Sequence, residues 1–184
     1  MSPNNVSNSI AEQVIPAGLM YSAILVTATL LLGCAAADCV RCNESKARPF
    51  RVQESTTVLV PACSKWVPTG IIVRQGECYS VESLPPDRWY DLIVAASATG
   101  YRSKTCIQRH FEPRRRVPSA PWFALCGSVT TSGRPFALNV LSTENSKEMN
   151  CTSDNGQLGV FANDIPDAYW NNWGSLRVRI TRIH

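Results

Sequence analysis

Two alternating stretches joined by a long polar loop constrain the fold of this chain most. Between Gln157 and Ile180, apolar residues occupy every second position on both sides of the loop: Leu158, Val160 and Ala162 before it, and Leu176, Val178 and Ile180 after it. A period of two is typical of a strand with one buried face. Short stretches of this kind recur with turn residues between them, which predicts an all-β chain folded as a small antiparallel β-sandwich.

Further strands are predicted over 58–60, 70–73, 78–81, 89–96, 122–129 and 136–141. Pro85 and Pro86 predict a break between the third and fourth of these, because proline cannot donate to a strand ladder. The segment 101–121 is rich in arginine, and Pro113, Pro118 and Pro121 argue against a regular helix there. The sequence therefore predicts strands and loops with no convincing helix.

The loop between the last two strands is crowded with oxygen-bearing side chains: Asn163, Asp164, Asp167, Asn171 and Asn172. Carboxylate, amide and backbone carbonyl oxygens are the ligands that calcium prefers. The same residue types also cap their own backbone in ordinary turns. Composition alone leaves both interpretations open.

The order of residues in this loop carries a resemblance to a known family. From Asn163 to Ser175 the chain reads Asn-Asp-x-Pro-x-x-Tyr-x-Asn-Asn-x-Gly-Ser. This pattern resembles the calcium loop of the galactose-specific, calcium-dependent bacterial lectins. A weaker similarity extends upstream through 58–79, Trp89 and Gly100, so that most of 58–184 is covered.

The resemblance implies a galactose-binding-domain-like β-sandwich with a calcium ion. Side chains of Asp164, Asn171 and Asn172 and the backbone carbonyl of Ala168 would be its ligands, with a further carbonyl from near Asp91 or Leu92. Sugar hydroxyls would complete the shell of the ion.

The chain departs from the family pattern at two places. Trp170 and Trp173 stand where the family has small residues, and a tryptophan there either stacks on a sugar face or plugs the pocket. The family also has a His-Pro pair that contacts the sugar, whereas His110 is followed here by Phe111.

The first residues read as an export leader. The apolar run 24–32 is too short to span a bilayer and ends in Leu31-Leu32-Gly33-Cys34, which resembles a bacterial lipobox. This predicts a lipoprotein signal peptide over 1–33, a lipidated Cys34 with a tether over 34–56, and the lectin-like domain over 57–184. The implied location is the periplasmic side of the outer membrane.

Two alternatives to the lipoprotein signal remain. Residues 1–19 lack Lys and Arg, which is unusual for a signal. Ordinary cleavage after Ala35-Ala36-Ala37 would give a soluble periplasmic protein, and a buried helix is the third interpretation of the apolar run.

Cysteine content agrees with export. Eight cysteines indicate an oxidising compartment and disulfides. With Cys34 lipidated, seven remain, so at least one is unpaired or bonded to another chain, and the pairing is open. For Cys39-x-x-Cys42 a structural disulfide is favoured over redox chemistry or zinc.

No catalytic constellation is visible, because the chain has two histidines, one of them its last residue, and no nucleophile elbow. The chain is therefore expected to be non-enzymatic. A net charge of +4 could attract nucleic acid, but export of the protein argues against nucleic acid as a partner.

Two functions are predicted. The first is an envelope lipoprotein that binds carbohydrate or a glycoconjugate through Asp164, Trp170 and Asn171 beside calcium. The second is a periplasmic immunity protein that neutralises a secreted, envelope-targeting toxin such as a lipase. Its contact surface would consist of residue types enriched in interfaces: Arg114, Arg115, Arg116, Trp170 and Trp173.

Overall fold

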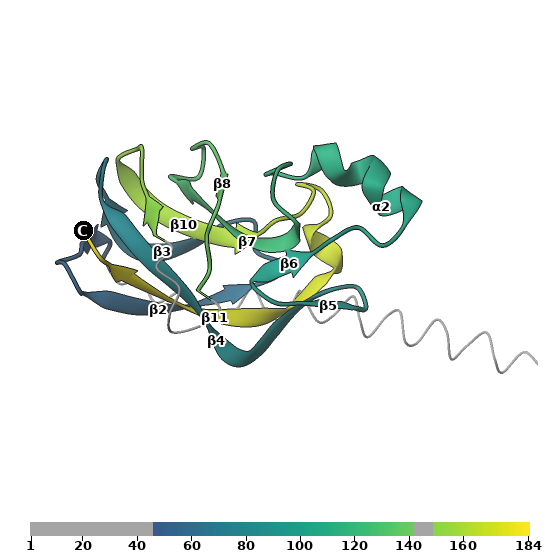
Figure 1. Cartoon of the computed structure of the whole chain (residues 1–184), viewed down its shortest axis with the longest axis horizontal. Coiled ribbons are helices and arrows are strands. Elements are labelled where there is room, and N and C mark those ends of the chain that lie inside the picture. The colour runs from purple at the N-terminus through teal and green to yellow at the C-terminus, as the bar shows by residue number, and fades with distance from the viewer. Residues whose placement is uncertain (1–45, 142–148) are drawn as a thin grey trace, which may run out of the picture.

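The computed structural model describes residues 46–141 and 149–184, in which two β-sheets pack face to face (Figure 1). The first sheet has the order β1 (Arg48–Pro49), β3 (Val67–Val73), β10 (Gly156–Ala162), β7 (Trp122–Val129) and β6 (Thr99–Tyr101), and β8 (Phe136–Ala137) pairs with β7. The second has the order β2 (Ser55–Pro61), β11 (Asn172–Arg182), β4 (Cys78–Asp91) and β5 (Val94–Ala96), and β9 (Asn150–Cys151) pairs with β4. The all-β sandwich predicted from the sequence is confirmed.

The core lies between the sheets and is built from the inward side chains of alternating strands. In β11, Leu176, Val178 and Ile180 are fully buried, as their spacing predicted. Trp89 of β4 is also fully buried, and its indole Nε1 donates to the carbonyl of Val60 at 2.8 Å. This bond satisfies the only polar atom of the largest side chain in the core.

Strand β7 is buried on both faces, because a second apolar cluster covers the outer side of its sheet. The segment after the 3-10 helix η2 (Glu112–Arg114) supplies Val117 and Ala120 to this cluster, where they pack with Phe161 of β10. The loop 115–121 is therefore part of the packed structure rather than a free surface segment.

The predicted break at Pro85 and Pro86 is wrong. Strand β4 runs without interruption from Cys78 to Asp91, and its register against β11 shifts where Ser175 faces Arg88 and Arg177 faces Leu84. The shift marks a bulge that takes the two prolines out of the ladder, which is where strands tolerate proline. The predicted strand over 89–96 is instead the end of β4, a tight turn at Leu92 with φ of 52°, and β5.

The expectation of no helix within 101–121 is also wrong. Helix α2 spans Cys106–Phe111 and starts with a capping box, in which Thr105 and Gln108 bond each other's backbone. Because the first proline of the segment is Pro113, about one and a half turns fit before it. The prolines limit the length of the helix and do not forbid it.

The sandwich begins upstream of the domain boundary predicted at residue 57. Strand β1 pairs in parallel with β3, placing Arg48 opposite Ile71, and Phe50 is buried in the core. The predicted signal peptide, Cys34 and the Cys39–Cys42 pair lie outside the described residues. Within 46–141 and 149–184, no helix is long and apolar enough to cross a membrane.

One disulfide joins Cys78 of β4 to Cys151 of β9, and the two residues face each other in the ladder. Cys63, Cys106 and Cys126 carry free thiols, and Cys126 is buried. The part of the chain that the structure describes therefore combines one covalent cross-link with three unpaired cysteines.

Replacing both Cys78 and Cys151 by serine should lower the free energy of unfolding by about 2–5 kcal/mol, because the disulfide closes a long loop in the unfolded chain. The bond links positions 73 residues apart. Urea unfolding of the full chain measures the loss, and Cys63→Ser, which removes a free thiol, is the control. An unchanged midpoint in the double variant would show that the cross-link does not stabilise the fold.

Candidate functional site

The loop with the calcium-like pattern lies between β10 and β11 at one end of the sandwich, next to the hairpin of β4 and β5 (Figure 1). It contains the 3-10 helix η3 (Tyr169–Asn171). Because Asn172, the first residue of β11, faces Asp91, the last residue of β4, the ladder brings a second carboxylate beside the loop.

Asn163 ties the loop to the rest of the fold and is fully buried. Its side-chain oxygen accepts from Val117 N at 3.0 Å, and its Nδ2 donates to the carbonyls of Val117, Ala120 and Pro121 at 2.9, 3.2 and 2.9 Å. Sequence reasoning counted Asn163 among the polar loop residues but missed this structural role. The loop 117–121 lies more than forty positions away along the chain, so no local pattern reveals it.

Asp164 and Asn172, two of the predicted calcium ligands, are brought together and are both buried. The carboxylate of Asp164 accepts from Asn172 Nδ2 at 2.8 Å and from the backbone N–H of Ile165 at 2.7 Å. Asn172 Nδ2 also reaches the carbonyl of Ala62 at 3.4 Å. The two side chains therefore share one enclosed polar position at the end of the sheet.

Burial raises the pKa of Asp164 to about 6, and the nearby charge of Asp91 adds to the increase. Hydrogen bonds from Asn172 and Ile165 oppose it but do not cancel it. A buried carboxylate normally has a cationic partner, whereas the Asn172 and Ile165 groups that donate to this one are neutral amides. The electrostatics of the position thus favour a bound cation.

Asn171, the third predicted side-chain ligand, faces Asp91 rather than Asp164. Its Nδ2 donates to Asp91 Oδ1 at 3.1 Å, while its Oδ1 is buried with no hydrogen-bond partner in the described structure. A buried carbonyl-type oxygen without a donor is costly and is a suitable ligand for a hard cation.

Ala168, predicted to contribute its carbonyl, sits at the start of η3. Its carbonyl accepts from the backbone N–H of Asn171 at 3.3 Å. A carbonyl oxygen has a second lone pair, so this bond is compatible with metal coordination.

The donor set fits calcium better than a softer metal. In the described ranges no group of three or more His, Cys, Asp or Glu side chains gathers. The oxygens that do gather come from carboxylates, amides and backbone carbonyls, which is the mixture that calcium takes.

The two tryptophans of the loop lie on its outside. Trp170 is 66% exposed and Trp173 is 41% exposed. The ring of Trp173 stacks on Tyr90 with centroids 3.8 Å apart and planes 4° from parallel, and its Nε1 donates to the carbonyl of Leu92 at 2.6 Å. Trp173 is therefore held flat against the sheet, and neither ring fills the interior of the loop.

The three consecutive arginines do not form one surface. Arg114 is exposed, but Arg115 is buried, with its guanidinium over the ring of Trp122 and its Nη2 donating to the carbonyl of Pro118 at 2.8 Å. Arg116 lies over Phe161, 3.5 Å from the ring centroid, and donates to the carbonyl of Lys65. Arg115 and Arg116 pack the loop 115–121 onto the sheet, so Arg115 offers no surface to a partner.

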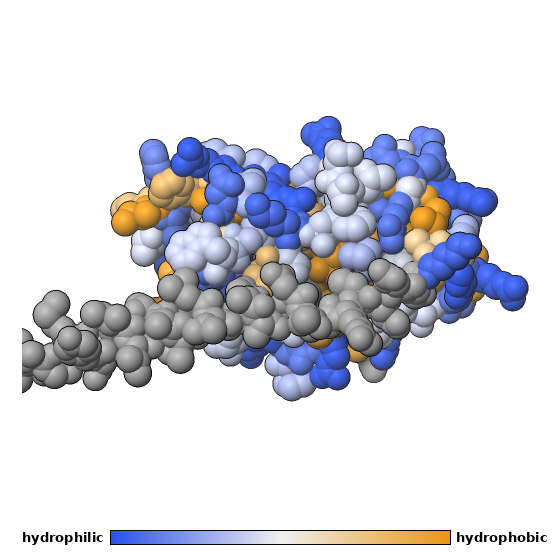
Figure 2. Space-filling view, turned by 180° about the vertical axis from the view of Figure 1, so that it is seen from behind, coloured by the Kyte–Doolittle hydropathy of each residue, from blue (hydrophilic) through white to orange (hydrophobic). Residues whose placement is uncertain are grey.

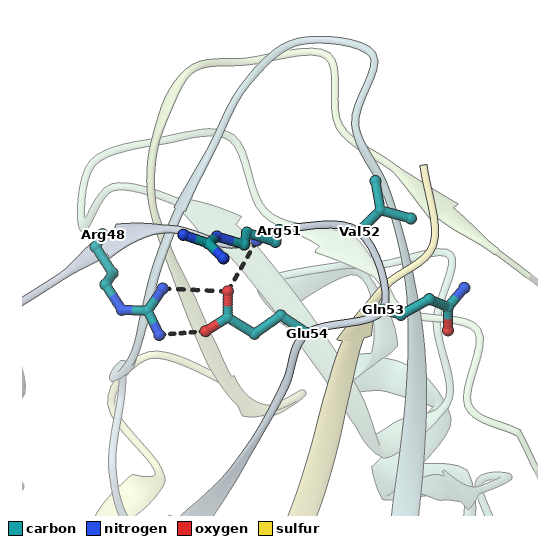
Figure 3. Close-up of a pocket in the computed structure, with 5 residues that line it drawn as sticks. All are labelled: Arg48, Arg51, Val52, Gln53 and Glu54. Atoms are coloured by element: carbon teal, nitrogen blue, oxygen red, sulfur yellow. Dashed lines mark hydrogen bonds and ion pairs between the residues drawn. The ribbon is translucent and has the colours of Figure 1, made fainter.

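A separate surface hollow is lined by residues 48 and 51–54, near the start of β2 (Figure 3). The Glu54 carboxylate points at Arg48 and accepts from Arg48 Nη1 at 3.1 Å and from the backbone N–H of Arg51 at 2.8 Å. The hydrogen bond from Arg48 lowers the pKa of Glu54 to about 2. The single carboxylate of this hollow is already bound by Arg48 and Arg51, so the hollow is a weaker candidate than the loop at the end of β10.

The face in Figure 2 is mostly hydrophilic, with apolar residues exposed in separate small patches. The large exposed apolar side chains include Leu92 at 56% and Ile93 at 91%, both in the turn between β4 and β5. Together with Trp170 and Trp173 they place apolar surface next to the candidate ion site.

Comparison with known proteins adds little to this description. No family model matches the chain, and no curated protein matches its sequence. A solved structure described as "EclA N-terminal domain; PllA-like lectin" is similar with a TM-score of 0.47 and 16% sequence identity, over 68% of this chain and 94% of that chain. At this similarity, the ligand of that domain says nothing about the ligand of this chain.

Proposed function

We propose that this chain is a non-enzymatic binding protein that holds calcium in the loop 163–172 and binds a carbohydrate or glycoconjugate beside it. The residues that would hold the ion are Asp164, Asn171 and Asn172 through their side chains and Ala168 through its carbonyl. Calcium, when bound, supplies exchangeable positions that neighbouring hydroxyl groups of a sugar can occupy. Trp170 would add an apolar surface for the sugar ring.

One observation carries this proposal: the loop buries a carboxylate that accepts from neutral amides, and a neighbouring amide oxygen in the loop is also buried. Asp164 is 2% exposed, and the buried Oδ1 of Asn171 has no hydrogen-bond partner in the described structure. A calcium ion would neutralise the Asp164 carboxylate, and the Oδ1 of Asn171 would coordinate it. A loop that only made a turn would not need to bury a carboxylate in this way.

We further propose that the protein belongs to the bacterial envelope. The sequence Leu31-Leu32-Gly33-Cys34 supports a lipid anchor at Cys34 on the periplasmic side of the outer membrane. The Cys78–Cys151 disulfide is in keeping with an oxidising compartment.

Calorimetric titration of the full chain with calcium tests the metal part of the proposal, and a glycan array with calcium or with chelator tests the sugar part. Saturable calcium binding and calcium-dependent glycan binding are expected, and both should be lost in Asp164→Ala. Asp167→Ala is the matched control, since Asp167 is an exposed carboxylate of the same loop. Glycan binding that survives in Asp164→Ala would contradict the assigned role of this residue.

A second function is favoured by the exposed apolar residues around the same end of the molecule. Ile93 is 91% exposed and Trp170 is 66% exposed, and such residues often anchor protein interfaces. This supports an immunity protein that covers a secreted, envelope-attacking enzyme such as a lipase. Inhibition of a lipase encoded beside this gene, lost in Trp170→Ala but kept in Asp164→Ala, would favour it over the carbohydrate proposal.

A further inference from the structure

Asp91 is the acidic residue closest to the candidate ion site that the sequence pattern does not include. We infer that the carboxylate of Asp91 is a second acidic ligand of the ion, beside that of Asp164. This inference rests on the proposed calcium site and adds a side chain to it. Sequence reasoning expected only a backbone carbonyl from this region.

The backbone fixes Asp91 in place from two directions. It ends β4 directly opposite Asn172 in the ladder with β11. The next residue, Leu92, donates its backbone N–H to the carbonyl of Asn171 at 3.3 Å. Asp91 therefore cannot move independently of the two adjacent asparagines that are proposed as ligands.

The side chain of Asp91 contacts Asn171, one of the proposed ligands. Its Oδ1 accepts from Asn171 Nδ2 at 3.1 Å, so the carboxylate already contacts one proposed ligand. Asn172 lies between the two carboxylates, since it faces Asp91 in the ladder and donates from its Nδ2 to Asp164 at 2.8 Å. Two carboxylates beside two adjacent asparagine amides form an oxygen-rich region with excess negative charge.

A further layer of contacts orients the Asp91 carboxylate. The Tyr101 hydroxyl donates to Asp91 Oδ2. Gln108 of α2 approaches the same hydroxyl at 3.5 Å, and the capping box with Thr105 fixes Gln108. Partners that hold a ligand's orientation are a common feature of metal sites. Helix α2 thus has a positioning role at the site.

The Asp91 side chain would bring a negative charge to the ion, which the backbone carbonyl of Leu92 cannot bring. Trp173 Nε1 donates to that carbonyl at 2.6 Å. A site with two carboxylates neutralises both charges of calcium, and the number of charged ligands is one of the factors that set calcium affinity. We therefore expect the ion to bind in the absence of any sugar.

Calcium titration of the full chain at neutral pH, with three charge-removing variants, tests the inference. Asp91→Asn should weaken calcium binding by at least about tenfold, and Asp164→Asn should abolish it. Asp167→Asn, which removes one exposed charge from the same loop, should change the dissociation constant by less than about twofold. Cooperative unfolding without calcium checks that each variant folds.

A second measurement does not depend on the folding of Asp91→Asn. If calcium engages the Asp91 carboxylate, the hydroxyl of Tyr101 loses part of its acceptor, and its near-ultraviolet absorption changes. The full chain should show a calcium-induced tyrosine difference spectrum that is much reduced in Tyr101→Phe. A spectrum equal in both proteins would overturn the inference.

The outcomes separate this inference from the proposed function. Unchanged calcium affinity in Asp91→Asn, with binding lost in Asp164→Asn, would exclude Asp91 as a ligand and leave the calcium site standing. Absence of calcium binding in the unmodified chain would refute the proposed site and this inference together.

Discussion

Replacing Asn163 by alanine is expected to lower the free energy of unfolding by about 3–5 kcal/mol, because several buried polar groups lose their partner at once. The affected groups are the N–H and carbonyl of Val117 and the carbonyls of Ala120 and Pro121. This loss is a large part of the stability of an ordinary domain, which is about 5–15 kcal/mol. Urea unfolding of the calcium-free chain measures it.

A matched control for this variant is Asn155→Ala. Asn155 Oδ1 accepts one exposed hydrogen bond, from Gln75 N at 3.0 Å, so its loss should cost less than about 1 kcal/mol. A change of similar size in both variants would show that Asn163 does not hold the loop 117–121. The same result would remove the structural explanation for the first position of the loop pattern.

Calcium is expected to stabilise the folded chain strongly. At a calcium concentration one hundred times the dissociation constant, the gain is about 2.7 kcal/mol, which corresponds to a rise of roughly 5–10 °C in the midpoint of thermal unfolding. The physical reason is that the ion compensates for the burial of Asp164, which is 2% exposed. Differential scanning calorimetry with calcium and with chelator measures the shift.

Magnesium and one variant provide the controls for this prediction. Magnesium should stabilise the chain less, because it requires a near-octahedral shell and keeps its water. Asp164→Ala should show no calcium-dependent shift. If calcium raised the thermal midpoint of Asp164→Ala by the same amount, the stabilising ion would bind at a site that does not include Asp164.

The strands around the loop could be predicted because their pattern is local. Leu176, Val178 and Ile180 alternate with polar residues, and all three are buried as expected. The continuous strand through Pro85 and Pro86 could not be predicted, since it depends on a bulge against Ser175 and Arg177 of a distant strand. Strand pairing decided that outcome, and local propensity did not.

The site shows the same division. The loop pattern indicated Asp164, Asn171 and Asn172, and the structure brings Asp164 and Asn172 together, whereas Asn171 faces Asp91. The role proposed for the Asp91 side chain could not be predicted, because only the register of β4 against β11 places Asp91 beside the loop. Arg115 was assigned to a surface because arginine is usually exposed, whereas its contacts with Trp122 and Pro118 bury it.

Strand β4 connects two stabilising features of different chemistry, a disulfide and the proposed calcium site. One end of this 14-residue strand carries Cys78, bonded covalently to Cys151, and the other end carries Asp91 beside the proposed ion. Removal of calcium would break only the ion contacts at the Asp91 end and would leave the disulfide in place. If calcium binds as proposed, the protein would release its ligand when the surrounding calcium falls and bind it again when calcium returns, while the fold stays intact.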